Sequence, residues 1–326
     1  MQKKSRYLFS WFYLLLLVTI LSVEGLLLLR KKGFFYQAPQ YEVNLFTEFE
    51  QPIFVASESA QLVMTAEQLA SYVTAEAFFV IDNTTQTILL EKNPQLPLSP
   101  ASTTKLMTVY TALKNYDLDQ VIAVSTASVK ANNGVGFFPL EQVKVKDLAA
   151  ASLISSANDA AYALADGFVD GYESFIEEMN KFTQELNLTS TNFTNAVGYD
   201  HPDNLSTAHD LAVLTMKVFQ EKPIAEWMSL KNYVVESIDG KTRHFLFSTN
   251  ELLGSESGVI AGKTGTTPLA KEVLVSVSEV NQHQYITVVM GSEDRYQDTS
   301  LLLNWLKDNL QWQKVEFPLQ ISKESL

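Results

Sequence analysis

The chain has 326 residues, of which 46% are hydrophobic and 19% charged, a composition typical of a globular protein with one large core or two modest ones. Its formal net charge is −13, and residues 33–326 carry 18 Lys and Arg against 36 Asp and Glu. This acidity excludes a nucleic-acid partner, because binding to phosphates needs clustered cations. Cysteine is absent and the four histidines have no metal-ligand spacing, so we expect no disulfide, no metal site and no cofactor.

Residues 1–32 are predicted to form a membrane anchor. Three cations precede an apolar run over residues 7–29, and three more follow it. As a helix, such a run can span about 30 Å of hydrocarbon. No A-x-A-like site follows it, which favours an uncleaved transmembrane helix, with a cleaved signal peptide as the alternative.

The remaining elements are predicted in chain order from periodicity and turn signals. Residues 33–61 have no sustained period and are interpreted as a stalk, and a short helix is expected over 62–73. A hairpin follows, with strands over 75–82 and 87–93 around the turn "NTTQ". Helical periodicity dominates 102–219, three strands follow over 257–267, 272–280 and 284–292, and an amphipathic helix over 298–312 precedes a polar tail, 316–326.

The order of these elements indicates a single α/β domain over about 62–315. Strands joined by short turns pair in antiparallel fashion. We therefore expect one antiparallel sheet, built from both ends of the chain and flanked by helices, with a helical subregion inserted between its strands.

The stretch "LSPASTTKLMT" places Ser102 and Lys105 one helical turn apart. Residues at this spacing share a helix face, so the lysine amine can reach the serine hydroxyl. A serine needs a base to act as a nucleophile, and a lysine can be that base where burial lowers its pKa. The alternative is ordinary: serine is a favoured helix cap, and the S-x-x-K spacing is common.

Two further motifs are weak when taken singly. Ser156 and Asn158, in "SSANDAA", offer a hydroxyl for proton transfer and a carboxamide to grip a peptide bond, or they form only a polar helix junction. The stretch "KTGTT", Lys263–Thr267, offers a cation and hydroxyls for a carboxylate, and Gly265 lets a substrate backbone approach the strand. A phosphate loop is excluded, because the glycine it requires six residues before Lys263 is Ser257.

Together, S-x-x-K, S-x-N and K-T-G are the trio of active-serine, penicillin-interacting enzymes. From about Ala75 to Trp312 the sequence resembles the D-alanyl-D-alanine carboxypeptidases, which are the low-molecular-mass penicillin-binding proteins. "PASTTKLMT", "SSANDAA", "NFTNAVGYD" with "LSTAHDLA", and "KTGTT" carry this resemblance.

The resemblance implies a β-lactamase/transpeptidase-like fold and acyl transfer at the junction of sheet and helices. Ser102 would attack the penultimate D-alanine carbonyl of a peptidoglycan stem pentapeptide, with Lys105 as general base. Ser156 would pass the proton to the leaving D-alanine, and the backbone N–H groups of Ser102 and Thr266 would form the oxyanion hole. Water would then hydrolyse the acyl-enzyme, and penicillin would block it covalently.

Substrate binding is implied for a second set of residues. Asn158 would hold the substrate amide, Lys263 would sustain the local field, and Arg295 would lie near the terminal carboxylate. The alternative for Arg295 is a surface ion pair with Glu293 or Asp294. The carboxylate would be seated by Thr264, Thr266 and Thr267.

The sequence also departs from the family pattern. Lys271 follows Ala270 where the family has an "AG" pair, and the turn "NTTQ" lacks the usual glycine. About fourteen residues follow Trp312, which is too few for the β-rich second domain and C-terminal amphipathic helix of many members. We therefore expect the N-terminal helix to be the anchor, with residues 33–326 outside the cell membrane, and the partners to be stem peptide, β-lactams and membrane.

Other activities on the same fold stay open. A serine β-lactamase would share the trio, but no glutamate lies between Glu185 and Glu221 to activate the deacylating water, as one does in class A enzymes. A D,D-transpeptidase differs only in passing the acyl group to an amine. A catalytically silent wall-binding protein is the non-enzymatic alternative.

Overall fold

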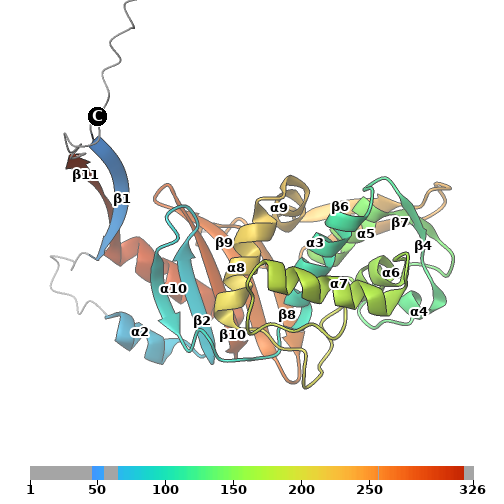
Figure 1. Ribbon diagram of the computed structural model, residues 1–326, viewed down its shortest axis with the longest axis horizontal. Coiled ribbons are helices and arrows are strands. Elements are labelled where there is room, and N and C mark those ends of the chain that lie inside the picture. The colour runs from blue at the N-terminus through green and yellow to red at the C-terminus, as the bar shows by residue number, and fades with distance from the viewer. Residues whose placement is uncertain (1–45, 55–64, 256, 319–326) are drawn as a thin grey trace, which may run out of the picture. The chain divides into compact units, whose positions relative to one another are not determined.

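The computed structural model describes residues 46–54, 65–255 and 257–318 (Figure 1). The predicted anchor, residues 1–32, lies outside this part. Within it, no helix combines the length and apolar character needed to cross a bilayer.

A five-stranded antiparallel sheet forms the centre of the molecule, in the order β3-β2-β10-β9-β8. This confirms the predicted antiparallel sheet built from strands distant in sequence. The strands are β2 (Ala77–Asp82), β3 (Ile88–Lys92), β8 (Val259–Thr267), β9 (Lys271–Val280) and β10 (His283–Ser292). β8 lies at one edge, so among the described strands it has a neighbour on one side only.

Both faces of the sheet are covered, which explains why its strands are apolar without alternation. In β2, Phe79 and Ile81 belong to the core shared with the helical subregion, whereas Phe78 and Val80 belong to a second core. Since successive side chains of a strand point to opposite faces, the two cores lie on opposite sides of the sheet. On the second side lie α2 (Ala66–Tyr72) and α10 (Arg295–Asn309), and α8 (Ala208–Phe219) lies across the first (Figure 1).

The predicted helical subregion is present between β3 and β8. Its helices are η1 (Ala101–Thr104), α3 (Lys105–Asn115), α4 (Thr126–Val129), α5 (Val145–Ile154), α6 (Asn158–Asp166), α7 (Tyr172–Glu185), α8 and α9 (Lys222–Ser229). The structure adds two small antiparallel pairs that periodicity did not indicate. These are β4 (Val121–Ala123) with β5 (Gln142–Lys144), and β6 (Asn232–Glu236) with β7 (Arg243–Phe247). Strands of three to five residues are too short to show a period.

The two ends of the described chain differ from the sequence-based assignment. Within the predicted stalk lies β1 (Phe46–Phe54), which pairs with β11 (Leu310–Pro318). The last helix accordingly ends at Asn309, and a strand replaces its predicted final turn and the start of the polar tail. Pairing between segments so far apart in the chain leaves no local periodicity by which to predict it.

Candidate active site

The turn η1 and helix α3 bring Ser102 and Lys105 together. The Lys105 Nζ lies 3.0 Å from the Ser102 Oγ and donates a 2.6 Å hydrogen bond to the Val197 carbonyl. Ser102 is not a helix cap: Pro100 holds the cap position of η1 and Thr104 that of α3, and neither cap makes a side-chain hydrogen bond. The ordinary alternative for this motif therefore fails.

The Lys105 side chain is fully buried, at 0% exposure. Burial lowers the pKa of Lys105 to about 7, and the negative charge of Asp159 offsets part of this effect. A lysine with this pKa holds a substantial neutral fraction near pH 7. The structure thus provides the condition that a lysine base requires.

Tight backbone packing fixes the position of the nucleophile. Ala101 has φ of 46°, and a Cβ built on Gly198 would lie 1.9 Å from its carbonyl oxygen. On the other side, a Cβ on Gly265 would lie 2.9 Å from the Ser102 nitrogen. Glycine at both positions lets the segment 197–198 and strand β8 close on η1 from two directions.

Ser156 is joined to Lys263 across the cleft. The Lys263 Nζ donates 2.8 Å and 2.7 Å hydrogen bonds to the Ser156 Oγ and the Thr264 carbonyl. Burial lowers the pKa of Lys263 well below its ordinary value, and the positive charges of Lys105 and Arg295 lower it further. Ser156 itself has φ of 56°, a conformation that non-glycine residues adopt at a cost and that often occurs at functional sites.

Asn158 begins helix α6 and is 5% exposed. Its Nδ2 donates a 2.6 Å hydrogen bond to the Asn132 carbonyl, which fixes the orientation of the carboxamide. Its Oδ1 is buried and has no hydrogen-bond partner among the described residues. A buried acceptor without a partner is costly, so this oxygen is suited to a donor from a bound ligand, such as an amide N–H.

Arg295, the first residue of α10, reaches the strand β8 at the same cleft. Its Nη1 donates hydrogen bonds of 2.8 Å to the Gly265 carbonyl and 2.5 Å to the Thr266 Oγ1. Its backbone N–H donates to Glu272 at 3.1 Å. The predicted alternative partners are engaged elsewhere, since Glu293 pairs with Lys271 and the Asp294 side chain caps α10.

Of the remaining residues in the K-T-G stretch, some line the cleft and one does not. Thr264, Gly265 and Thr266 line the cleft, and Thr264 exchanges a 2.6 Å hydrogen bond with Thr249. Thr267 is not among the lining residues, and its hydroxyl instead donates to Asp200 at 2.6 Å.

Lys271, the departure from the family pattern, also lies outside the cleft lining. Its φ is 53°, a conformation that suits glycine. Its amine pairs with Glu76 at 3.1 Å and with Glu293 at 3.0 Å. Lys271 therefore lies at the turn between β8 and β9 and not in the cleft lining.

The cleft has a volume of about 380 Å³, and sequence reasoning missed four of its lining residues. These are Asn133, Gly134, Ser155 and Thr249. Asn133 and Gly134 belong to a loop whose next three backbone N–H groups, at residues 135–137, donate to the Asp159 carboxylate. The loop and Thr249 carry no sequence motif by which to predict them. Ser155 could have been predicted, because it is adjacent to Ser156.

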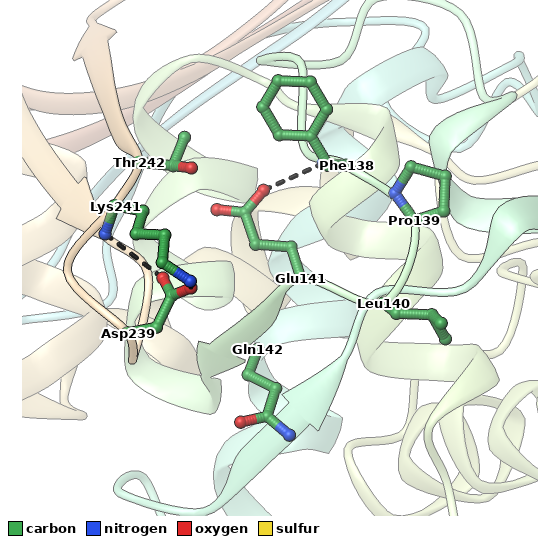
Figure 2. Close-up of a pocket in the computed structure, with 8 residues that line it drawn as sticks. All are labelled: Phe138, Pro139, Leu140, Glu141, Gln142, Asp239, Lys241 and Thr242. Carbon is green, nitrogen blue, oxygen red and sulfur yellow. Dashed lines mark hydrogen bonds and ion pairs between the residues drawn. The ribbon is translucent and has the colours of Figure 1, made fainter.

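A second pocket, of about 330 Å³, lies between the segment 138–142 and the turn at 239–242 (Figure 2). Its charged groups are already paired: Lys241 with Asp239 at 2.8 Å, and Glu141 with His244 at 2.8 Å. It contains no serine or other activated nucleophile, so the catalytic chemistry is assigned to the first cleft. In the described part of the chain, no three His, Cys, Asp or Glu side chains are grouped to hold a metal ion.

Comparison with known proteins identifies the family of this chain. A profile of the peptidase S11 family, described as D-alanyl-D-alanine carboxypeptidase, matches residues 63–294. The chain is 31% identical over 270 residues to the D-alanyl-D-alanine carboxypeptidase DacC of Escherichia coli, covering 76% of this chain and 65% of that protein. It is 32% identical over 266 residues to DacA of Haemophilus influenzae, covering 77% and 65%. The chain thus spans just under two thirds of the length of these relatives.

Solved structures agree with the fold. The crystal structure of a Streptomyces DD-transpeptidase matches with a TM-score of 0.67 and 30% identity, covering 72% of this chain and 97% of the other. The D-alanyl-D-alanine carboxypeptidase of Mycobacterium tuberculosis matches with a TM-score of 0.67 and 27% identity, covering 72% and 90%. The transpeptidase-like fold predicted from the sequence is therefore confirmed.

Proposed function

The chain belongs to the peptidase S11 family of D-alanyl-D-alanine carboxypeptidases, and from this premise we propose that it removes the terminal D-alanine from peptidoglycan stem pentapeptides. The observation that carries the proposal is the fully buried Lys105 amine, 3.0 Å from the Ser102 hydroxyl at the mouth of a polar cleft. An unactivated serine is a poor nucleophile, and this pairing provides the base.

In the proposed reaction, neutral Lys105 takes the proton of Ser102 as its oxygen attacks the penultimate D-alanine carbonyl. The backbone N–H groups of Ser102 and Thr266 stabilise the oxyanion, which contributes about 3 kcal/mol in comparable sites. The C–N bond then breaks, Ser156 passes a proton to the departing D-alanine nitrogen, and water later releases the peptide from Ser102.

The substrate is held by groups on both sides of the cleft. The unpartnered Asn158 Oδ1 accepts an N–H of the stem peptide. Arg295 and the hydroxyls of Thr264 and Thr266 surround the terminal carboxylate, and the buried Lys263 lies behind them with its amine bonded to Ser156. Thr267 is left out of this set, since its hydroxyl is bonded to Asp200.

Product analysis on a soluble pentapeptide ending in D-Ala-D-Ala tests the proposal. We expect stoichiometric release of free D-alanine and the tetrapeptide, lost in Ser102→Ala. Cross-linked dimers formed in the presence of an amine acceptor would instead indicate a transpeptidase, the activity named for the Streptomyces structure. Rapid turnover of nitrocefin would indicate a β-lactamase, and absence of any reaction a silent binding protein.

We also propose that residues 1–32 anchor the protein in the cell membrane, with the catalytic domain on the outer side, where pentapeptide is found. The apolar run at residues 7–29 and its flanking cations support this localisation. Resistance of the full-length protein to alkaline carbonate extraction from membranes, lost when residues 1–32 are deleted, is the expected result. Equal extraction of both forms would contradict an anchor.

A further inference from the structure

The outward face of the β6–β7 hairpin is apolar. Val234 lies opposite Phe245 and Asn232 opposite Phe247, so these side chains share one face. Val234, Phe245 and Phe247 are 46%, 65% and 66% exposed. The side chains of the other face, which include Val235 and Leu246, are buried in the core of the helical subregion.

An antiparallel sheet with one packed face ordinarily carries polar residues on the other. This hairpin carries aromatic and β-branched residues there instead, and Ile238 beyond the end of β6 is exposed as well. Of thirteen large hydrophobic side chains that are exposed in the described part of the chain, four lie on this hairpin. Such a concentration marks a contact surface.

This face is continuous with the rim of the catalytic cleft. The Ser155 Oγ donates a 3.0 Å hydrogen bond to the Phe247 carbonyl and accepts one of 2.9 Å from the Phe247 N–H. Ser155 lines the cleft beside Ser156, and so does Thr249, two residues after Phe247. A polymer whose end lies in the cleft and which leaves on this side therefore passes onto the aromatic face.

The charges on the outward face of the hairpin, and on the whole chain, limit which partner can bind there. The only charged side chains on the outward positions of β6 and β7 are Glu236 and Arg243, which pair with each other at 3.5 Å. Binding to an anionic membrane surface needs an excess of Lys and Arg, whereas this chain has a net charge of −13. The same acidity opposes the association of two copies.

An uncharged sugar polymer suits a surface that is both aromatic and without net charge. Pyranose rings present C–H faces that pack on aromatic rings, and their hydroxyl and amide groups suit a polar margin such as Asn232. The proposed substrate is itself a peptide attached to a glycan, so the occupant is the rest of the same molecule.

We propose that Val234, Phe245 and Phe247 form a binding surface for the N-acetylhexosamine glycan strand that carries the stem peptide. This inference rests on the proposed function for the identity of the polymer. The surface guides glycan-attached peptides into the cleft and gives no advantage to free peptides.

Binding to uncharged N-acetylglucosamine oligomers tests the proposal without any turnover. We expect the wild-type protein to bind them and the Phe245→Ser/Phe247→Ser variant to bind about tenfold more weakly or worse. Tyr72→Ser is the matched control, because Tyr72 is 64% exposed but lies on α2, on the other side of the central sheet. Circular dichroism melting curves show whether each variant is folded.

A second measurement compares two substrates. In the double variant, kcat/KM for a free pentapeptide should be unchanged, while KM for the glycan-attached peptide rises about tenfold. Absence of glycan binding by the wild type, or equal loss in Tyr72→Ser, would overturn the proposal. So would a double variant that loses binding to anionic vesicles or self-association instead. Failure of the wild type to release D-alanine would count against the proposed function. It would not affect the glycan-binding measurement, which requires no turnover.

Discussion

The Lys263 amine donates a 2.8 Å hydrogen bond to the Ser156 hydroxyl, joining residues 107 positions apart in the chain. On the other side of the cleft, Lys105 makes the corresponding contact with Ser102 at 3.0 Å. The positive charge of Lys105 is one cause of the lowered pKa of Lys263, after burial. Lys105 thus disfavours the protonation of Lys263, and burial favours the neutral form of Lys105 itself beside the nucleophile.

The pH dependence of acylation follows from Lys105. Its pKa is lowered to about 7, mainly by burial, and only the neutral amine can accept the proton of Ser102. We expect the rate of acylation by a penicillin, measured by stopped flow, to rise with pH through about 7. A rate that is constant between about pH 5 and about pH 9 would contradict Lys105 as the base.

The lowered pKa of Lys105 also makes the stability of the fold depend on pH. In the unfolded chain a lysine keeps its ordinary pKa near 10.5, so between about pH 7 and that value the unfolded state binds more protons than the folded one. The contribution of Lys105 to the free energy of unfolding therefore rises with pH across this window. Lys105→Met should abolish acylation and flatten this rise in denaturant titrations, with Lys241→Met, an exposed lysine, as control.

Gly265→Ala should impair the site while leaving the fold intact. The added Cβ would lie 2.9 Å from the Ser102 nitrogen and 2.9 Å from the Ala101 Cβ, so β8 or η1 must shift. We expect the free energy of unfolding to fall by about 1–3 kcal/mol, and the acylation rate to fall at least about tenfold. If this variant is acylated at the wild-type rate, the close approach of β8 to η1 is not required for catalysis.

Arg295→Gln should weaken recognition of the terminal carboxylate. The variant loses a cation whose Nη1 is held by Gly265 and Thr266 at the cleft. For a pentapeptide with a free carboxylate we expect kcat/KM to fall about tenfold to a hundredfold, because hydrogen bonds to charged groups contribute about 1.5–3 kcal/mol. The amide-capped peptide should be nearly indifferent to the change. Equal losses on both peptides would argue for a structural role.

Lys271 should be replaceable by glycine but not by valine. Its φ of 53° suits glycine, and its two ion pairs with Glu76 and Glu293 are exposed. Exposed pairs contribute under about 1 kcal/mol, so Lys271→Gly should change the free energy of unfolding by less than about 1 kcal/mol. Lys271→Val should lower it by about 1–2 kcal/mol through backbone strain. If urea titrations rank the two variants in the opposite order, the ion pairs and not the backbone conformation determine this turn.

The sequence predicted those features that local spacing encodes. The three motifs identified the residues that line the cleft from η1, α6 and β8, and apolar runs identified the strands of the central sheet. Long-range pairing left no such trace, so the β1–β11 pair and the cleft residues Asn133 and Thr249 were not predicted. The β6–β7 hairpin was missed because its strands of five residues are too short to show a period. The resemblance placed Thr267 at the carboxylate with Thr264 and Thr266, yet adjacent strand residues face opposite ways, and the Thr267 hydroxyl is bonded to Asp200.

Mass mapping of a penicillin adduct decides whether Ser102 forms the acyl-enzyme. The purified protein is incubated with benzylpenicillin, digested and analysed by tandem mass spectrometry. We predict one adduct, on Ser102, that is absent from Ser102→Ala and present in Ser155→Ala, a cleft serine without a lysine partner in the described contacts. An adduct on another residue, or none on a folded wild-type protein, would rule out Ser102 as the nucleophile.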